Sequence, residues 1–212
     1  EDAKRLSDSL GDNAILIKGD IRIKEEVMQM RKELLDQKIS INTVIHNAIN
    51  DYKFNGEQRK KINEIDWQDF QNQIETSQRG FLNLLNIFTP NMKKDHFGRF
   101  ITIGTNLFQN PVVPYHDYTA AKGGLLSLTR TAAIELGQFN ITVNMISGGL
   151  LKITDASKCT PEEVFDYIKS ITPLRKVTTL DDFSDAVLFF ASPWSRAVTG
   201  QNLIVDGGLV LN

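Results

Sequence analysis

The sequence holds very little cysteine: Cys159 is the only one among its 212 residues. A single thiol excludes an internal disulfide and is typical of a reducing compartment, so the cytoplasm is the predicted location. Long apolar runs are missing as well. No stretch reaches the roughly 18 consecutive apolar residues that a membrane-spanning helix needs, and we expect no membrane partner.

Neither sign of charge is in excess. The 24 Lys and Arg residues nearly balance the 26 Asp and Glu residues, which leaves a formal net charge of −2 and a pI of about 6.0. Binding to nucleic acid or to an anionic membrane requires a basic surface that this balance does not predict. No residue is assigned to a metal.

Hydrophobic residues make up 41% of the chain, which is enough for a substantial core. We find no internal repeat, low-complexity segment or linker, so residues 1–212 are predicted to form a single domain. Residues 50–61 are polar and irregular, and we expect them to form a surface excursion.

Short apolar runs alternate with helical patterns along the whole chain. The predicted strands are Ala14–Lys18, Thr43–His46, Phe100–Ile103, Thr142–Ile146 and Asn202–Val205. The predicted helices are Ile23–Gln37, Trp67–Met92, Tyr118–Phe139, Pro161–Ser170 and Leu180–Ala191, with a further helix ending near Leu10. This alternation predicts an α/β fold with a doubly wound, mostly parallel sheet.

The most informative local pattern is Tyr118-Thr-Ala-Ala-Lys122 at the start of a predicted helix. Residues four positions apart on a helix share a face, so the phenol and the ammonium are expected to lie together. A nearby cation favours phenolate and is expected to lower the pKa of Tyr118 from about 10 toward neutrality. Such a group suits the interconversion of alcohols and carbonyls.

Several segments in order resemble the short-chain dehydrogenase/reductases, with the greatest similarity to 3-oxoacyl-acyl-carrier-protein reductases. The segments are Gly19-Asp-Ile21, His46-Asn-Ala48, Tyr118-x-x-x-Lys122, Ile141-Thr-Val-Asn-Met-Ile-Ser-Gly-Gly149, Thr172-Pro-Leu-Arg-Lys-Val-Thr-Thr179 and Val198-Thr-Gly-Gln-Asn-Leu-Ile-Val-Asp-Gly-Gly208. They cover nearly the whole chain. The resemblance implies a Rossmann-like fold and reduction of a ketone to a secondary alcohol.

The resemblance also implies catalytic roles. Tyr118 would donate the proton to the substrate oxygen, while Lys122 would lower its pKa and bind the nicotinamide ribose. Thr105 stands where the family has the serine that holds the substrate carbonyl, and a threonine hydroxyl can donate the same hydrogen bond. Ser77 stands where the family has a catalytic asparagine.

By the same resemblance the cofactor is NADP or NAD, with NADPH favoured. The implied cofactor-binding residues are Asp20, Ile21, Asn47, Ala48, Tyr118, Lys122, Gly149 and Thr154. Two positions depart from the family pattern, because Ile49 replaces a glycine and Gly148 replaces a proline.

The family's glycine-rich phosphate turn, T-G-x-x-x-G-x-G, has no counterpart in this sequence. That turn follows the first strand and holds the pyrophosphate with backbone amides at a helix N-terminus. We therefore expect a Rossmann-like domain that lacks its first βαβ portion, roughly 40 residues by the usual size of such a unit, and a natural protein that begins earlier.

Two other functions stay open. Tyr115 lies seven positions before Lys122, which is the spacing of the related enoyl-carrier-protein reductases, so an enoyl reductase could use Tyr115 with Lys122. The replaced residues also allow a catalytically idle relative that binds a nucleotide or a partner. Tyr115 and Leu150 are candidate substrate contacts. The expected substrate is a small molecule or a carrier-linked acyl group, and the family implies a homodimer or homotetramer formed through Trp67–Met92, Tyr118–Phe139 and Val198–Asn212.

Overall fold

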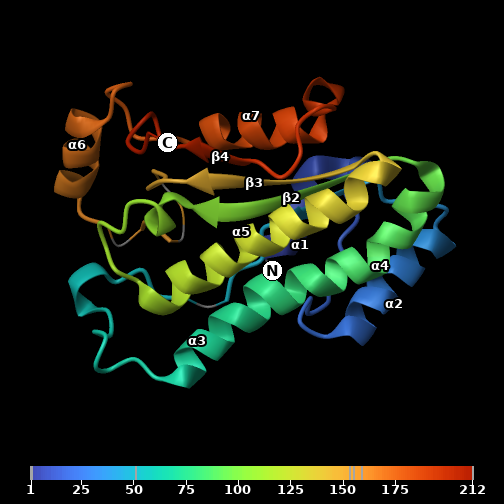
Figure 1. The fold of residues 1–212 in the computed structure, drawn as a ribbon, viewed down its shortest axis with the longest axis horizontal. Helices are drawn as coiled ribbons and strands as arrows, with labels where there is room; N and C mark the ends of the chain where they lie inside the picture. Colours follow the sequence, from blue (N-terminus) through green and yellow to red (C-terminus); the bar gives the residue numbers. More distant parts are fainter. Residues whose placement is uncertain (1, 51, 153, 155, 159, 212) are drawn as a thin grey trace.

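We describe the fold from a computed structural model (Figure 1). The structure describes residues 2–50, 52–152, 154, 156–158 and 160–211. Cys159 therefore lies outside the described residues.

A four-stranded parallel sheet forms the centre of the molecule. Its strands are β1 (Thr43–His46), β2 (Gly98–Thr105), β3 (Ile141–Gly148) and β4 (Asn202–Val205), and they lie side by side in that order. His46 pairs with Thr102, and Thr105 pairs with Gly148. Almost every residue of β2 and β3 is buried, as expected for central parallel strands covered on both faces.

Helices cover both faces of this sheet. α4 (Gly80–Asp95) and α5 (His116–Leu136) pack against β2, and α5 also packs against β3, whereas α7 (Leu180–Ala191) contacts β2, β3 and β4. Figure 1 shows α7 on the opposite side of the strands from α5. The remaining helices are α1 (Asp2–Leu10), α2 (Lys24–Asp36), α3 (Trp67–Ile74) and α6 (Glu162–Ile171). The predicted Rossmann-like α/β fold is confirmed.

Local sequence explains where two of these helices begin. The Asp66 carboxylate accepts a hydrogen bond from the Asp69 amide and the Asp69 carboxylate accepts one from the Asp66 amide, which closes a capping box before α3. Thr179 and Asp182 form the same box before α7. Each box satisfies backbone amides that have no partner in the first turn of a helix.

The core consists of two clusters, one on each face of the sheet. The larger contains Phe81, Phe100, Leu125 and Val143, between the sheet and the α4–α5 pair. The smaller contains Ile101, Ile146 and Phe190 beneath α7. Successive side chains of β2 point to opposite faces of the sheet, so Phe100 belongs to the larger cluster and Ile101 to the smaller one.

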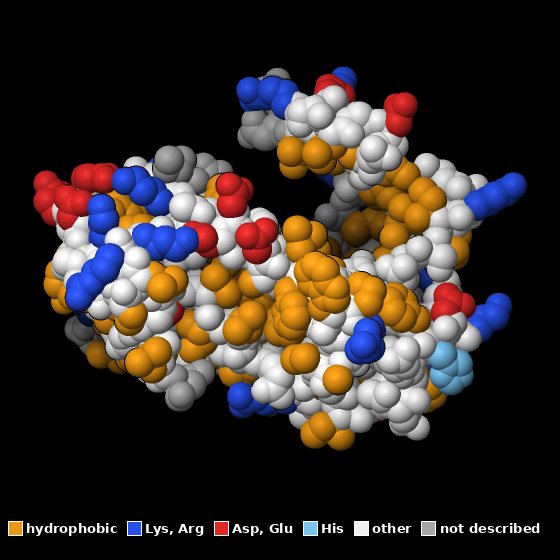
Figure 2. All heavy atoms as spheres, turned by 90° about the horizontal axis from the view of Figure 1, so that it is seen from above, with side chains coloured by type: hydrophobic (Ala, Val, Ile, Leu, Met, Phe, Trp, Pro, Cys, Tyr) orange, Lys and Arg blue, Asp and Glu red, His pale blue; other side chains and the backbone are white. Residues whose placement is uncertain are grey.

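Predicted and observed elements agree closely, with two differences. The predicted helix Trp67–Met92 is interrupted by a π-helical turn, Glu75–Arg79, between α3 and α4. The prediction of a strand at Ala14–Lys18 is wrong, because no described strand lies beside this segment to satisfy its backbone. Ile15 and Leu16 are 47% and 53% exposed. Viewed from above, the molecule shows many exposed hydrophobic side chains beside a deep hollow (Figure 2).

Candidate active site

The carboxyl ends of the four strands meet at one edge of the sheet, because the strands are parallel. β1 ends at His46, β2 at Thr105 and β3 at Gly148. Tyr118 and Lys122 lie in the first turns of α5, which follows β2 along the chain. Ligands of open α/β sheets bind at this edge.

Tyr118 and Lys122 are both buried and lie on the same face of α5. The Lys122 Nζ is 5.8 Å from the centre of the Tyr118 ring and donates a hydrogen bond of 2.7 Å to the carbonyl oxygen of Ile103 in β2. Burial lowers the pKa of Lys122 to about 8. The ammonium is therefore directed at the strand, beside the ring of Tyr118.

The protonation of Tyr118 differs from the sequence-based expectation. Burial raises the pKa of Tyr118 to about 12, and the hydroxyl of Thr105 acts in the opposite direction as a hydrogen-bond partner. Desolvation disfavours the phenolate. In this state of the protein, Lys122 does not bring the pKa of Tyr118 toward neutrality.

Thr105 occupies the last position of β2, and its side chain is buried. Its Oγ1 also accepts a hydrogen bond of 3.3 Å from the Leu107 amide, which caps the short 3-10 turn that follows. The structure thus brings Thr105, Tyr118 and Lys122 together, as the sequence predicted.

Ser77 lies in the π-helical turn and is buried. Its carbonyl oxygen lies 3.0 Å from the Nε2 of His46, so the carbonyl accepts from this nitrogen and Nδ1 carries no proton in the neutral ring. Burial and the charge of Lys122 lower the pKa of His46 to about 4. π-turns within α-helices often occur at functional sites. Here the carbonyl of Ser77 in the π-turn is hydrogen-bonded to His46 at the end of β1.

Sequence reasoning missed an aromatic group that covers Tyr118. The ring of Tyr52 stacks on that of Tyr118, with centroids 5.4 Å apart and 23° between the planes. Phe54 meets Tyr118 edge-on at 5.1 Å and Tyr115 at 5.6 Å. The Tyr52 hydroxyl donates a 2.8 Å hydrogen bond to Asp117 Oδ1. The only sequence signal was the presence of two aromatic residues in an otherwise polar segment.

Tyr115, the alternative tyrosine, is buried at the N-cap of α5. Its hydroxyl accepts a hydrogen bond of 2.8 Å from the Gly56 amide. Phe54 thus contacts both Tyr115 and Tyr118. Tyr115 ends the loop that leads into α5, as its seven-residue distance from Lys122 predicts.

Asp20 and Ile21 lie before α2; Asp20 has a local partner, whereas Ile21 contacts α4. Arg22 makes a bidentate ion pair with Asp20, in which Nη2 is 2.6 Å from Oδ2, and these hydrogen bonds lower the pKa of Asp20. The Ile21 carbonyl accepts a 2.8 Å hydrogen bond from Asn83. The Ile21 side chain reaches Gly80, where an added Cβ would lie 2.5 Å from Ile21 Cδ1.

The other predicted binding residues surround the same edge of the sheet. Asn47 and Ala48 are exposed just beyond β1. Gly149 follows β3, where a Cβ would lie 2.9 Å from Asp206 and 3.1 Å from Asn106 Nδ2. Leu150 is half-buried next to it, and Thr154 forms a turn in which its hydroxyl lies 2.9 Å from that of Ser157. Ile153 lies outside the described residues.

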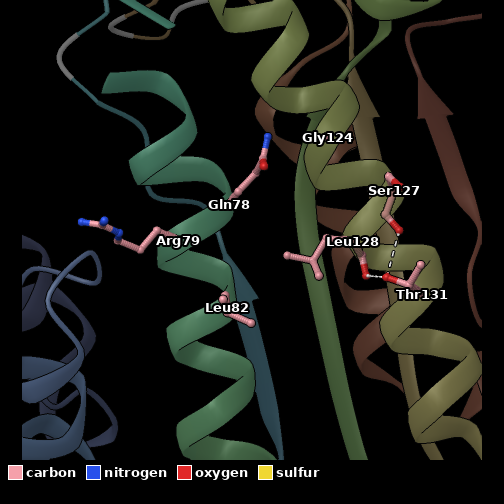
Figure 3. Close-up of a pocket in the computed structure, with 7 residues that line it drawn as sticks. All are labelled: Gln78, Arg79, Leu82, Gly124, Ser127, Leu128 and Thr131. Atoms are coloured by element: carbon pink, nitrogen blue, oxygen red, sulfur yellow. Dashed lines mark hydrogen bonds between the residues drawn. The ribbon is translucent and has the colours of Figure 1, made fainter. Parts of the chain in front are cut away.

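Two hollows lie near this region. A groove of about 500 Å³ lies between the π-turn and α4 on one side and α5 on the other, and Figure 3 shows its lining residues Gln78, Arg79, Leu82, Gly124, Ser127, Leu128 and Thr131. None of the predicted site residues lines it. A second pocket of about 340 Å³ lies against Tyr115 and includes Phe108, Pro111 and Pro114.

The residues that the structure describes contain no helix long and apolar enough to cross a membrane. Within the same residues, no group of three His, Cys, Asp or Glu side chains is placed to hold a metal ion.

Comparison with known proteins identifies the family. A family model described as "Enoyl-(Acyl carrier protein) reductase" matches residues 1–210. The chain belongs to this family of short-chain dehydrogenase/reductases. The fold, the segments in family order and the site at the strand edge agree with that assignment.

Curated relatives are 3-oxoacyl-[acyl-carrier-protein] reductases. The chain is 29% identical to the FabG protein of Staphylococcus epidermidis over 201 residues, which are 95% of this chain and 80% of that protein. It is 28% identical to FabG of Buchnera aphidicola subsp. Acyrthosiphon pisum over 209 residues, covering 98% of this chain and 82% of that protein.

Solved structures are similar in fold across nearly the whole chain. A putative gluconate dehydrogenase from Agrobacterium tumefaciens has a TM-score of 0.85 at 26% identity and covers 98% of this chain and 81% of its own. A 3-oxoacyl-[acyl-carrier protein] reductase with bound NAD from Brucella melitensis has a TM-score of 0.84 at 25% identity. The match covers 100% of this chain and 78% of that protein's chain.

Proposed function

We propose that this protein is an NAD(P)H-dependent ketone reductase that acts on 3-oxoacyl groups, free or linked to a carrier protein. The observation that carries the proposal is the buried pair Tyr118 and Lys122, with Thr105 as hydrogen-bond partner, at the carboxyl edge of the sheet. The named relatives with this activity support it.

The residues fit one end of a nicotinamide cofactor. The buried Lys122 ammonium has three N–H groups, of which Ile103 accepts one among the described contacts, so it can also donate to ribose hydroxyls. The close packing of Gly149 against Asp206 and Asn106 leaves no room for a side chain at that position. No segment of this sequence supplies the glycine-rich cradle for the diphosphate. When bound, the cofactor would supply the hydride; NADP remains favoured over NAD by resemblance.

The chain's own residues would handle the carbonyl oxygen. Tyr118 keeps its proton at neutral pH because its pKa is raised, so it can donate a hydrogen bond and then a proton to the oxygen. Thr105 would hold the same oxygen through its hydroxyl. Lys122, positively charged below its pKa of about 8, would stabilise negative charge that develops on Tyr118.

Two other reactions have support of their own. For enoyl reduction, Tyr115 is buried and its ring contacts Phe54, which also contacts Tyr118. The description of the matching family also names enoyl reduction. The similarity to a putative gluconate dehydrogenase raises oxidoreduction of a polyhydroxy acid. We rank enoyl reduction below 3-oxoacyl reduction because Thr105 acts on Tyr118 and not on Tyr115. We rank oxidoreduction of a polyhydroxy acid below it because the curated relatives are named as 3-oxoacyl reductases.

We also propose that a second copy of this chain packs on the groove shown in Figure 3. Ser127 and Thr131 are small exposed residues on α5 that let another helix approach closely, and Ile134 on the same helix is 85% exposed. A symmetric dimer would place the same apolar side chain on both partners. Location in the cytoplasm stays a prediction from the single cysteine.

The direct test is NADPH oxidation with three purified substrate types. A short 3-oxoacyl thioester, the matching enoyl thioester and 5-ketogluconate are compared by kcat/KM. The proposal predicts the highest value for the 3-oxoacyl thioester. A higher value for the enoyl thioester or for ketogluconate would replace it with the corresponding alternative.

A further inference from the structure

The rings of Tyr52 and Phe54 pack directly against the ring of Tyr118. The Tyr52 ring lies against the face of Tyr118, and the Phe54 ring meets it edge-on. Only 8% of the Tyr118 surface is exposed. A carbonyl oxygen must come within about 3 Å of the phenol to receive its proton, so an entering ketone meets these two rings.

The segment that carries these rings is fastened to the loop before and at the start of α5. Tyr52 donates to Asp117, the Gly56 amide donates to the Tyr115 hydroxyl, and Arg59 Nε donates to the Pro114 carbonyl at 3.2 Å. These three contacts come from consecutive parts of residues 52–59 and reach residues 114–117. The segment therefore follows the N-terminal end of α5 and is more than a surface excursion.

We propose that Tyr52 and Phe54 form the wall of the substrate site and select ketones with hydrocarbon next to the carbonyl over polyhydroxy ketones. This inference rests on the proposed ketone reductase activity.

The chemistry of the wall is apolar where the substrate would lie. Phe54 has no polar atom, and the hydroxyl of Tyr52 is engaged by the carboxylate of Asp117, which is itself buried. Ring carbons offer no hydrogen bond to a substrate hydroxyl, and a hydroxyl that leaves water without a new partner is penalised. A hydrocarbon segment gains from the same contact.

Room for a hydrocarbon continues beyond the wall. Tyr115 contacts both Tyr52 and Phe54, and it also lines the pocket of about 340 Å³ together with Phe108, Pro111 and Pro114. This volume lies in the usual range of small-molecule sites. The wall and the pocket share Tyr115, so the pocket adjoins the wall.

Substrate preference tests the proposal. The kcat/KM ratio of an N-acetylcysteamine 3-oxobutanoyl thioester to 5-ketogluconate is measured for the wild type, Phe54→Ser and Phe54→Leu. We expect Phe54→Ser to lower the ratio about tenfold, in the range that a change of one apolar contact produces, and Phe54→Leu to keep it near the wild-type value. Phe139→Ser, at the far end of α5, is the matched control with an unchanged ratio. An unchanged ratio in folded Phe54→Ser would overturn the proposal.

A second readout needs no turnover and so separates this inference from the proposed function. Nitration of Tyr118 by tetranitromethane, followed by peptide mass spectrometry, reports how well the wall covers the phenol. We expect several-fold faster nitration of Tyr118 in Tyr52→Leu than in the wild type, and no change in Tyr167→Leu, where the substituted tyrosine is on α6. An equal rate in folded Tyr52→Leu would show that Tyr52 does not wall the site, whatever the enzyme reduces.

Discussion

His46 Nε2 lies 3.0 Å from the carbonyl oxygen of Ser77, which joins the end of β1 to the π-helical turn between α3 and α4. The His46 ring also stacks on Phe81, 5.7 Å between centroids. The imidazole is buried, and burial together with the charge of Lys122 keeps its pKa at about 4. His46 is thus a neutral structural link beside the candidate active site.

This link predicts a loss of stability in mild acid. The pKa of His46 is about 6.5 in the unfolded chain and about 4 in the folded protein, so between these values the unfolded chain binds more protons. The free energy of unfolding should therefore fall by about 2–3 kcal/mol from His46 alone as the pH drops from about 7.5 to 4.5. Urea denaturation at both pH values measures it.

The matched variants are His46→Gln and His116→Gln. We expect His46→Gln to be less stable than the wild type at neutral pH and to lose most of this pH dependence. His116→Gln, a change at the first residue of α5, should keep it. The same pH dependence in His46→Gln and in the wild type would contradict the assignment.

The depressed pKa of Lys122 predicts the alkaline limb of the activity profile. Its ammonium form is the one that stabilises charge on Tyr118, so kcat/KM for ketone reduction should fall as the pH rises through about 8. Lys122→Arg keeps the charge at all these pH values and should shift the limb upward, at a lower plateau. A limb at the same pH in Lys122→Arg would assign it to another group.

We expect ketone reduction to require the hydroxyl of Thr105 but not its methyl group. Thr105→Val keeps the shape of the side chain but removes the hydroxyl that interacts with Tyr118, and it should lower kcat about 10²- to 10³-fold by analogy with the loss of one catalytic hydrogen bond. Thr105→Ser restores the hydroxyl and should retain most activity. Steady-state kinetics with a 3-oxoacyl thioester decide, and equal activities of the two variants would remove Thr105 from the site.

The proposed dimer face predicts a change of oligomeric state from a single surface charge. Ile134→Lys places an ammonium at the most exposed apolar side chain of α5, and burying an unpaired charge in an interface is unfavourable. Light scattering after size exclusion should give a smaller mass for Ile134→Lys than for the wild type. Leu188→Lys, an exposed position on α7, is the control. A wild-type protein that is already monomeric would refute this face as an interface.

Most of the fold was predictable because apolar periodicity, turn residues and capping residues agree with one another. β1, β4 and α7 have the predicted bounds, and β2 and β3 extend the predicted strands by one to two residues at each end. Ala14–Lys18 has the composition of a strand, but none of the described strands lies beside it. Composition alone does not reveal whether a partner strand is present.

The site was predictable only in part. Tyr118, Lys122 and Thr105 lie together because a helix turn and a strand end fix them, and both are legible in the sequence. The approach of Tyr52 to Tyr118 depends on hydrogen bonds with partners 55 to 65 positions away, which no local pattern encodes. The raised pKa of Tyr118 follows from the burial of its side chain, which Tyr52 and Phe54 help to produce. Because these contacts are long-range, no local pattern predicts that pKa.

In ketone reduction we expect Tyr118, and not Tyr115, to donate the proton. The most direct measurement is the rate of NADPH-dependent reduction of a 3-oxoacyl thioester by Tyr118→Phe and by Tyr115→Phe, with the enoyl thioester assayed in parallel. We expect kcat to fall at least about 10²-fold in Tyr118→Phe, in line with removal of a general acid, and much less in Tyr115→Phe. Full ketone reduction by folded Tyr118→Phe would contradict it.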